Sequence, residues 1–207
     1  MKRISYQEFV KWENLVKKND LFLDVGCWSG STVLRMNDKC DAYGVDFNKE
    51  TLKLADKRIA EKVKYSDITK GIAFYKKFDW VLCGEVLEHI EEDEKALKNI
   101  AKVMKKDGKL VLTTPRSVPF FEFWDPAWVR WKFGEKERHW HYSLDELGRK
   151  MNEAGLRILK VAVRGNLLWV FRRWVNVVMK YLFRSNFRVD GEWGDGFADF
   201  MILAEKI

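Results

Sequence analysis

The sequence predicts an α/β protein with a mostly parallel sheet. Short apolar runs bounded by turn residues alternate with amphipathic stretches of helical spacing, which is the order that a parallel sheet with crossover helices requires. At 207 residues the chain is long enough for one domain with a full core, and neither internal repeats nor low-complexity tracts divide it. We therefore expect a single domain over residues 1–207 that begins with an amphipathic helix over 4–18.

The first expected strand is the apolar run that begins at Leu21, and it ends in an acid followed by a turn suited to a nucleotide. Residues 24–30 read D-V-G-C-W-S-G, and a helix follows from Ser31. Glycine adopts positive φ without steric cost and lets a ligand approach the backbone, while the first N–H groups of the next helix point toward the turn. Asp46 ends the next apolar run, about twenty residues on, where a carboxylate reaches a ribose diol in nucleotide-binding α/β folds.

The remaining elements follow from the same patterns. Further apolar runs predict strands. The sequence S-L-D-E at 143–146 is a capping box that predicts the start of a helix, which ends near Gly155. The expected later strands are 63–65, 80–83, 109–115, 156–163 and 197–207, and the expected helices include 91–105 and 166–184.

Four motifs in order over 21–115 resemble class I S-adenosylmethionine-dependent methyltransferases, in particular the small-molecule, ubiquinone-biosynthesis type. They are the glycine turn, the acids after the second and third strands, E-V-L-E-H-I at 85–90, and a helix followed by K-D-G and a strand ending in T-P. The resemblance implies a Rossmann-like, doubly wound, seven-stranded and mostly parallel sheet, with the last strand antiparallel at the sheet edge. It also implies S-adenosyl-L-methionine as cofactor and in-line methyl transfer.

The resemblance also assigns roles to residues. It places Asp24, Gly26 and Gly30 at the methionine side, Asp46 at the ribose and Asp67 at the adenine amino group. Trp28 departs from the family, which often has glycine there. The full set of implied cofactor-binding residues is Asp24, Gly26, Cys27, Trp28, Gly30, Asp46, Phe47, Asp67, Ile68, Cys83 and Glu85.

Acceptor choice must lie in the variable segments 116–142 and 164–196. The first is rich in aromatic residues and follows the fifth strand, which favours an apolar acceptor pocket, although a hydrophobic cluster that pins a long loop is the alternative. His139 and His141 are the candidate general bases for an oxygen nucleophile, since histidine titrates near neutrality. His89, beside Glu88, is interpreted as structural or cofactor-side.

The expected helix 166–184 combines a broad apolar face with a narrow basic stripe. Such a helix suits a membrane surface, and the alternatives are a lid over the acceptor pocket or a contact in a homodimer. The stripe consists of Arg172, Arg173, Asn176, Lys180 and Arg184.

Composition limits the other classes. The formal charge of +7 permits an anionic partner, but the basic residues are mixed with acids, so nucleic acid is not expected. Cys27, Cys40 and Cys83 lack metal-ligand spacing and predict a reducing compartment, without a disulfide framework or a metal site. With no apolar signal region or spanning run, we expect a cytoplasmic protein, or one peripheral at the inner membrane face.

The predicted function is therefore methyl transfer to oxygen of a small, largely apolar or lipid-like acceptor. The alternatives are a catalytically silent S-adenosylmethionine-binding partner or regulatory subunit, and an RNA methyltransferase. A nicotinamide oxidoreductase is disfavoured because two of the three glycines of the dinucleotide fingerprint are missing.

Overall fold

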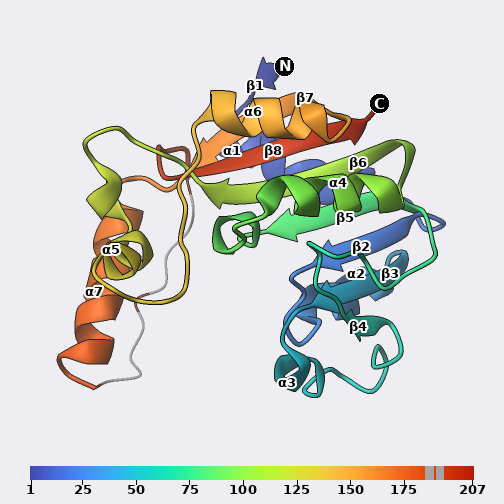
Figure 1. The fold of residues 1–207 in the computed structure, drawn as a ribbon, viewed down its shortest axis with the longest axis horizontal. Coiled ribbons are helices and arrows are strands. Elements are labelled where there is room, and N and C mark those ends of the chain that lie inside the picture. Colours follow the sequence, from blue (N-terminus) through green and yellow to red (C-terminus); the bar gives the residue numbers. More distant parts are fainter. Residues whose placement is uncertain (185–188, 190–193) are drawn as a thin grey trace.

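Eight strands form one sheet in the part of the chain that the computed structural model describes, residues 1–184, 189 and 194–207 (Figure 1). Their order across the sheet is β1-β7-β8-β6-β5-β2-β3-β4. The strands are β1 (Lys2–Arg3), β2 (Leu21–Val25), β3 (Asp41–Asp46), β4 (Val63–Tyr65), β5 (Phe78–Gly84), β6 (Met104–Pro115), β7 (Leu156–Arg164) and β8 (Asp199–Lys206). Residues 185–188 and 190–193 of the predicted variable segment 164–196 lie outside the described residues.

The predicted parallel sheet with an antiparallel last strand is confirmed. Strands β4, β3, β2, β5 and β6 are parallel neighbours, and β8 runs antiparallel to both β6 and β7. The expected edge position of the last strand is wrong, because β7 pairs with the free side of β8. The β8 residues Asp199 to Glu205 are all buried, as in an interior strand. The additional strand relative to the expected seven is β1, which pairs with β7 over two residues.

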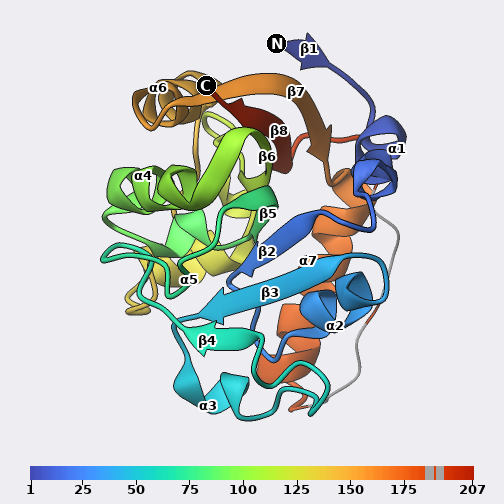
Figure 2. The same cartoon turned by 90° about the vertical axis from the view of Figure 1, so that its right-hand side faces the viewer.

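Helices cover both faces of this sheet (Figure 2). Alternate residues of the strands point to opposite faces, so each strand contributes to two hydrophobic cores. The helices are α1 (Tyr6–Phe9), α2 (Ser31–Asn37), α3 (Lys49–Leu52), α4 (Asp93–Val103), α5 (Pro126–Lys132), α6 (Leu144–Glu153) and α7 (Leu167–Tyr181). In β2, for example, Leu23 packs in the core beneath α4 and α6, and Phe22 packs in the core beneath α1 and α2.

Local signals in the sequence account for most helix ends. The Ser143 hydroxyl accepts a hydrogen bond from the Glu146 amide at 3.1 Å, as the capping box predicts, and Gly155 beyond the helix has a φ of 77°. The N-terminal helix expected over 4–18 is different: α1 has only four residues, and a 3-10 helix continues from Val10 to Leu15.

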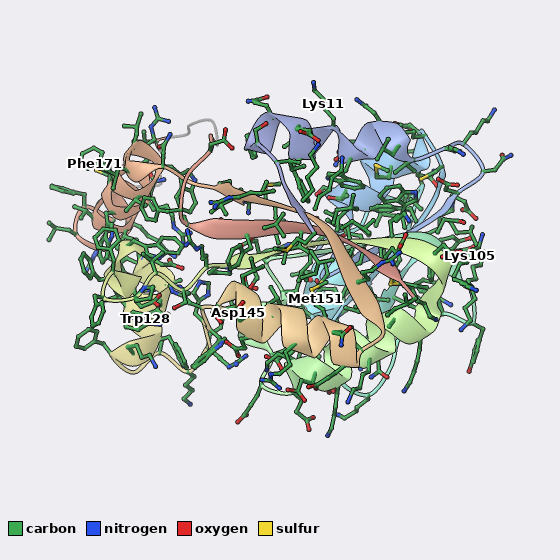
Figure 3. All side chains as sticks on the ribbon, turned by 90° about the horizontal axis from the view of Figure 1, so that it is seen from above. Lys11, Lys105, Trp128, Asp145, Met151 and Phe171 are labelled. Carbon is green, nitrogen blue, oxygen red and sulfur yellow. The ribbon has the colours of Figure 1, made fainter. Side chains whose placement is uncertain are left out.

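Helices α5 and α7 stand together beyond the carboxyl ends of the strands (Figure 1). We call residues 116–142 and 165–184 the α5–α7 module. It has a small core of its own around Trp124 and Trp169, while Trp128 lies in α5 and Phe171 in α7 (Figure 3). Of the aromatic residues of 116–142, Trp124 and Phe121 belong to this core, Trp140 and Tyr142 pack in the main core of the sheet, and Phe120 and Phe133 are exposed. No helix in the described ranges is long and apolar enough to cross a membrane.

Candidate active site

A cavity of about 750 Å³ opens at the carboxyl ends of β5, β2, β3 and β4. These four parallel strands are adjacent in the sheet, so the loops that leave them converge on one edge, where ligands bind in open α/β sheets. Of the residues predicted from the sequence, those lining the cavity are Gly26, Trp28, Asp46, Phe47, Asp67, Ile68 and Glu85.

The turn after β2 is held against the end of β3. The amides of Gly26 and Cys27 both donate to the Val45 carbonyl, at 2.8 and 3.0 Å. Gly26 has a φ of 78°, and a Cβ there would lie 2.2 Å from a methyl carbon of Val86. Both the conformation and the close approach therefore require glycine at this position.

Trp28 occupies the next part of the turn in an unusual conformation. Its φ is 53°, in the left-handed region that a bulky side chain rarely adopts. Its amide donates to Asp46 Oδ2 at 2.7 Å, which anchors the backbone, and the indole is 66 % exposed beside the cavity. The turn thus holds a left-handed backbone at Trp28 without the glycine that the family often has at this position.

Asp46 ends β3 with both carboxylate oxygens oriented by backbone amides. Oδ2 accepts from Trp28 and Oδ1 accepts from Asn48 at 2.8 Å. Each oxygen keeps a further lone pair for a ligand hydroxyl. At the end of β4, Asp67 accepts from the Thr69 hydroxyl at 2.6 Å, and hydrogen bonds from Thr69 and Lys70 lower the pKa of its carboxyl group. The cavity therefore presents two carboxylates with fixed orientations.

Four predicted cofactor residues lie behind this wall. Asp24 is buried, and its burial, reinforced by the charge of Asp46, raises its pKa to about 7. Cys27 packs beneath Gly44 and Cys83 is fully buried in the core, while Gly30 precedes α2. These residues could interact with a cofactor only through their backbone atoms or through the long-range charge of Asp24. Their predicted roles in cofactor binding stay predictions.

At the end of β5, Glu85 is tied to the neighbouring strands. It accepts from the Thr113 hydroxyl at 2.7 Å and from Arg164 at 2.8 Å, and its φ is 55°. Glu88 follows in the 3-10 helix Leu87–His89 and is completely buried. Burial, together with the nearby charge of Glu85, raises the pKa of Glu88 well above its ordinary value.

The two candidate bases belong to a buried network. His139 Nε2 and His141 Nε2 lie 2.7 and 3.3 Å from the same Asp125 oxygen, and Arg173 donates to the other at 2.6 Å. Burial alone would raise the pKa of Asp125, but the hydrogen bonds from both histidines and the Arg173 charge hold it well below its usual range. Neither histidine lines the described cavity, whereas His89 does.

Sequence reasoning missed the acids of this network. Asp125 caps α5 by accepting from the Ala127 amide, and Glu122 pairs with His141 Nδ1. Their signal was the presence of acids within the strongly apolar run F-F-E-F-W-D at 120–125, since such acids are buried only with partners.

The sheet order, the glycine turn and the acid at the end of β3 define a Rossmann-like protein with a nucleotide site. The model of the methyltransferase domain family matches residues 7–161, so the chain belongs to that family. The family predicted from the sequence is thus confirmed, and with it the class of S-adenosylmethionine-dependent methyltransferases.

Similarity to individual proteins agrees with the family. Demethylmenaquinone methyltransferase of Lactobacillus johnsonii is 31 % identical over 106 residues, which cover 46 % of this chain and 43 % of the relative. Ubiquinone biosynthesis O-methyltransferase of Coxiella burnetii is 29 % identical over 119 residues, which cover 54 % and 49 %. The matches span less than half the length of these curated relatives.

Solved structures share the fold across almost the whole chain. An S-adenosylmethionine-dependent methyltransferase from Clostridium acetobutylicum has a TM-score of 0.65 at 14 % identity, covering 96 % of this chain and 92 % of that one. Magnesium protoporphyrin IX methyltransferase from Synechocystis, with bound S-adenosylhomocysteine, has a TM-score of 0.63 at 15 % identity, covering 97 % and 80 %. At such identities the likeness concerns the fold.

Proposed function

We propose that the cavity binds S-adenosyl-L-methionine and that the protein transfers its methyl group to an oxygen of a small, largely apolar acceptor. The observation that carries the cofactor is Asp46. Its carboxylate ends β3, is oriented by two backbone amides and lies on the cavity wall next to the glycine turn. In this arrangement the ribose diol binds Asp46, the methionine end lies along the Gly26 turn, and the adenine lies toward Asp67 and Ile68.

The acceptor class is supported by the names of two relatives. One is a demethylmenaquinone methyltransferase and the other a ubiquinone biosynthesis O-methyltransferase, which points to small apolar acceptors. A third, named phosphoethanolamine N-methyltransferase 2, is the reason to test nitrogen acceptors as well. In the reaction an acceptor oxygen forms a bond to the methyl carbon while the carbon–sulfur bond breaks, and S-adenosylhomocysteine leaves. The protein mainly positions the two partners and excludes water.

A general base is needed only if the acceptor oxygen carries a proton at the working pH. His139 and His141 stay the predicted bases, but each ring is buried and already shares the Asp125 carboxylate. Neither ring lines the cavity, so a base at either position would have to act through a further group.

Calorimetry with S-adenosylhomocysteine tests the cofactor assignment. A hydrogen bond to an ionised carboxylate contributes about 1.5–3 kcal/mol, so Asp46→Ala is expected to weaken binding by roughly 10- to 100-fold. Asp41→Ala, at the opposite end of the same strand, is the matched control and should retain the wild-type affinity. Unchanged affinity in Asp46→Ala would remove Asp46 from the site, and tighter binding of NAD would refute the cofactor.

Methyl transfer to a quinol-type acceptor would distinguish the enzyme from a silent partner or regulatory subunit. RNA methylation with binding that falls steeply with salt would favour the nucleic-acid alternative, because phosphate contacts release counterions.

For the exposed face of α7 we propose contact with an anionic membrane surface. Leu167, Leu168 and Phe171 are exposed there, and Lys180 and Arg184 are exposed cations farther along. The basic stripe predicted from the sequence needs a correction, because Arg173 points inward to Asp125. Trp169 is buried against the module, as the lid and homodimer alternatives require. The exposed face of the helix must therefore distinguish a membrane surface from a lid or a homodimer contact.

A further inference from the structure

Two segments far apart in the sequence bring three metal-ligating side chains together beside the cavity. The 3-10 helix after β5 carries Glu88 and His89, and the loop after α5 carries His139. The amide of Trp140 donates to the Glu88 carbonyl at 3.0 Å and fixes one segment against the other. One ligand atom from each of the three side chains lies within 4.8 Å of the other two.

Two of these side chains have a buried polar atom that nothing satisfies. Glu88 is 0 % exposed and His139 is 8 % exposed. Among the described residues, Glu88 Oε1 and His139 Nδ1 have no hydrogen-bond partner. A buried carboxylate oxygen and ring nitrogen without partners are costly, so native structures nearly always provide one. Because the three side chains each have a ligand atom within 4.8 Å of the others, one cation that accepts electron pairs from Glu88 and His139 would satisfy both atoms.

In each of the two histidines, one ring nitrogen has a hydrogen-bond acceptor beside it, which leaves the other ring nitrogen available to a metal. His139 Nε2 lies 2.7 Å from Asp125, and His89 Nδ1 lies 2.8 Å from the Arg138 carbonyl. Donation to these acceptors leaves lone pairs on His139 Nδ1 and His89 Nε2. Metal-bound histidines characteristically donate their other ring N–H to a carboxylate or carbonyl in this manner.

The spacing fits a first-row cation. His89 Nε2 is 3.8 Å from Glu88 Oε1. Two ligands bound tetrahedrally to Zn²⁺ at about 2.1 Å lie about 3.4 Å apart, so a small side-chain rotation closes the site. Two histidines and one carboxylate are a ligand set of catalytic zinc centres, in which the fourth position stays open.

A second triad, formed by Asp125, His139 and His141, is a weaker candidate. Its atoms are already hydrogen-bonded to one another, and Arg173 donates to Asp125 at 2.6 Å. The guanidinium already supplies a positive charge there. Asp125 therefore acts as a positioning residue that orients His139.

We propose that Glu88, His89 and His139 bind a divalent transition-metal cation, with Zn²⁺ as the best fit, at the border of the cavity. His89 lines the cavity, so the open coordination position is available to an oxygen of a bound molecule. If the proposed methyl transfer to oxygen is correct, that molecule is the acceptor, and the cation would favour its ionised form, as metals do for bound water.

Metal binding is tested on the full chain without cofactor or acceptor. Protein stripped with a chelator is titrated with Zn²⁺ by calorimetry and with Co²⁺ by visible absorption, which reports the coordination geometry. We expect one saturable site with a tetrahedral or five-coordinate Co²⁺ spectrum. His89→Gln and His139→Gln should each weaken binding at least 100-fold, whereas His141→Gln should keep one site.

Three results would overturn the proposal: no saturable binding, unchanged binding in both His89→Gln and His139→Gln, or loss in His139→Gln and His141→Gln with unchanged binding in His89→Gln, which would favour the second triad. Circular dichroism of each metal-free variant ensures that lost binding does not reflect unfolding, and the partly exposed His89 is the variant least prone to it. Since S-adenosylhomocysteine affinity is measured separately on metal-free protein, failure of the metal site and failure of the cofactor site can be distinguished.

Discussion

The left-handed conformation of Trp28 gives a stability prediction with a matched control. The residue has a φ of 53° and is 66 % exposed, so truncating the side chain removes little burial. Trp28→Ala keeps a Cβ in the left-handed region, at a cost of roughly 1–2 kcal/mol, and Trp28→Gly removes that cost. Glycine loses part of the gain through the entropy of the unfolded chain, about 0.5–1 kcal/mol. The glycine variant should therefore be more stable than the alanine variant by about 1 kcal/mol.

Lys98 provides the control for this comparison, because it is exposed within helix α4. There glycine should be less stable than alanine by about 1 kcal/mol, the opposite sign. Urea unfolding of the four variants measures both differences, and thermal unfolding should show a shift of about 2–4 °C per kcal/mol for a chain of this size. If Trp28→Ala equals or exceeds Trp28→Gly in stability, the turn does not hold position 28 in the left-handed region.

Two further predictions concern charge. Burial raises the pKa of Asp24 from its ordinary value of 3.8 to about 7, so ionisation of this group lowers the stability of the folded state as the pH rises through this interval. Asp24→Asn should gain stability over the wild type between pH 4 and 7, by up to about 4 kcal/mol, and a difference independent of pH would exclude this cause. Reversing Arg172, Lys180 and Arg184 to glutamate should abolish co-sedimentation with anionic vesicles, since each cation contributes roughly 1 kcal/mol at such a surface. The same reversal at Lys95, Lys98 and Lys102 in α4 should not, and wild-type protein that stays in the supernatant at low salt would favour a lid or dimer contact.

Much of the sheet was predictable because interior strands such as β2 and β5 are largely buried and therefore read as short apolar runs. The apolar run that begins at Leu21 became β2, and the expected strand 63–65 became β4. The position of β8 was not predictable in this way, because an apolar strand looks the same at an edge or between two neighbours. Only the pairing of β7 on its outer side makes it an interior strand.

The cavity wall was predictable for a related reason. Parallel strands end at one edge of the sheet. Acids at or just after the ends of neighbouring strands, such as Asp46 and Asp67, therefore lie at the same edge independently of the loop conformations. Residues brought together by loops were not predictable. His139 was singled out as a base, but its proximity to Glu88 depends on the path of the α5–α7 module, which apolar spacing does not encode.

The conformations at the two strand ends indicate that the cavity is formed before any ligand binds. Trp28 and Glu85 both hold positive φ values, at the ends of neighbouring strands β2 and β5. In each case a hydrogen bond from the backbone amide holds the residue in this conformation. The Trp28 amide donates to the Asp46 carboxylate, and the Glu85 amide donates to the Thr113 carbonyl at 3.0 Å. Strained residues of this kind persist only where the surroundings over-determine them, and they cluster at functional sites. Since the fold has already ordered these residues, a ligand need not supply that ordering free energy when it binds.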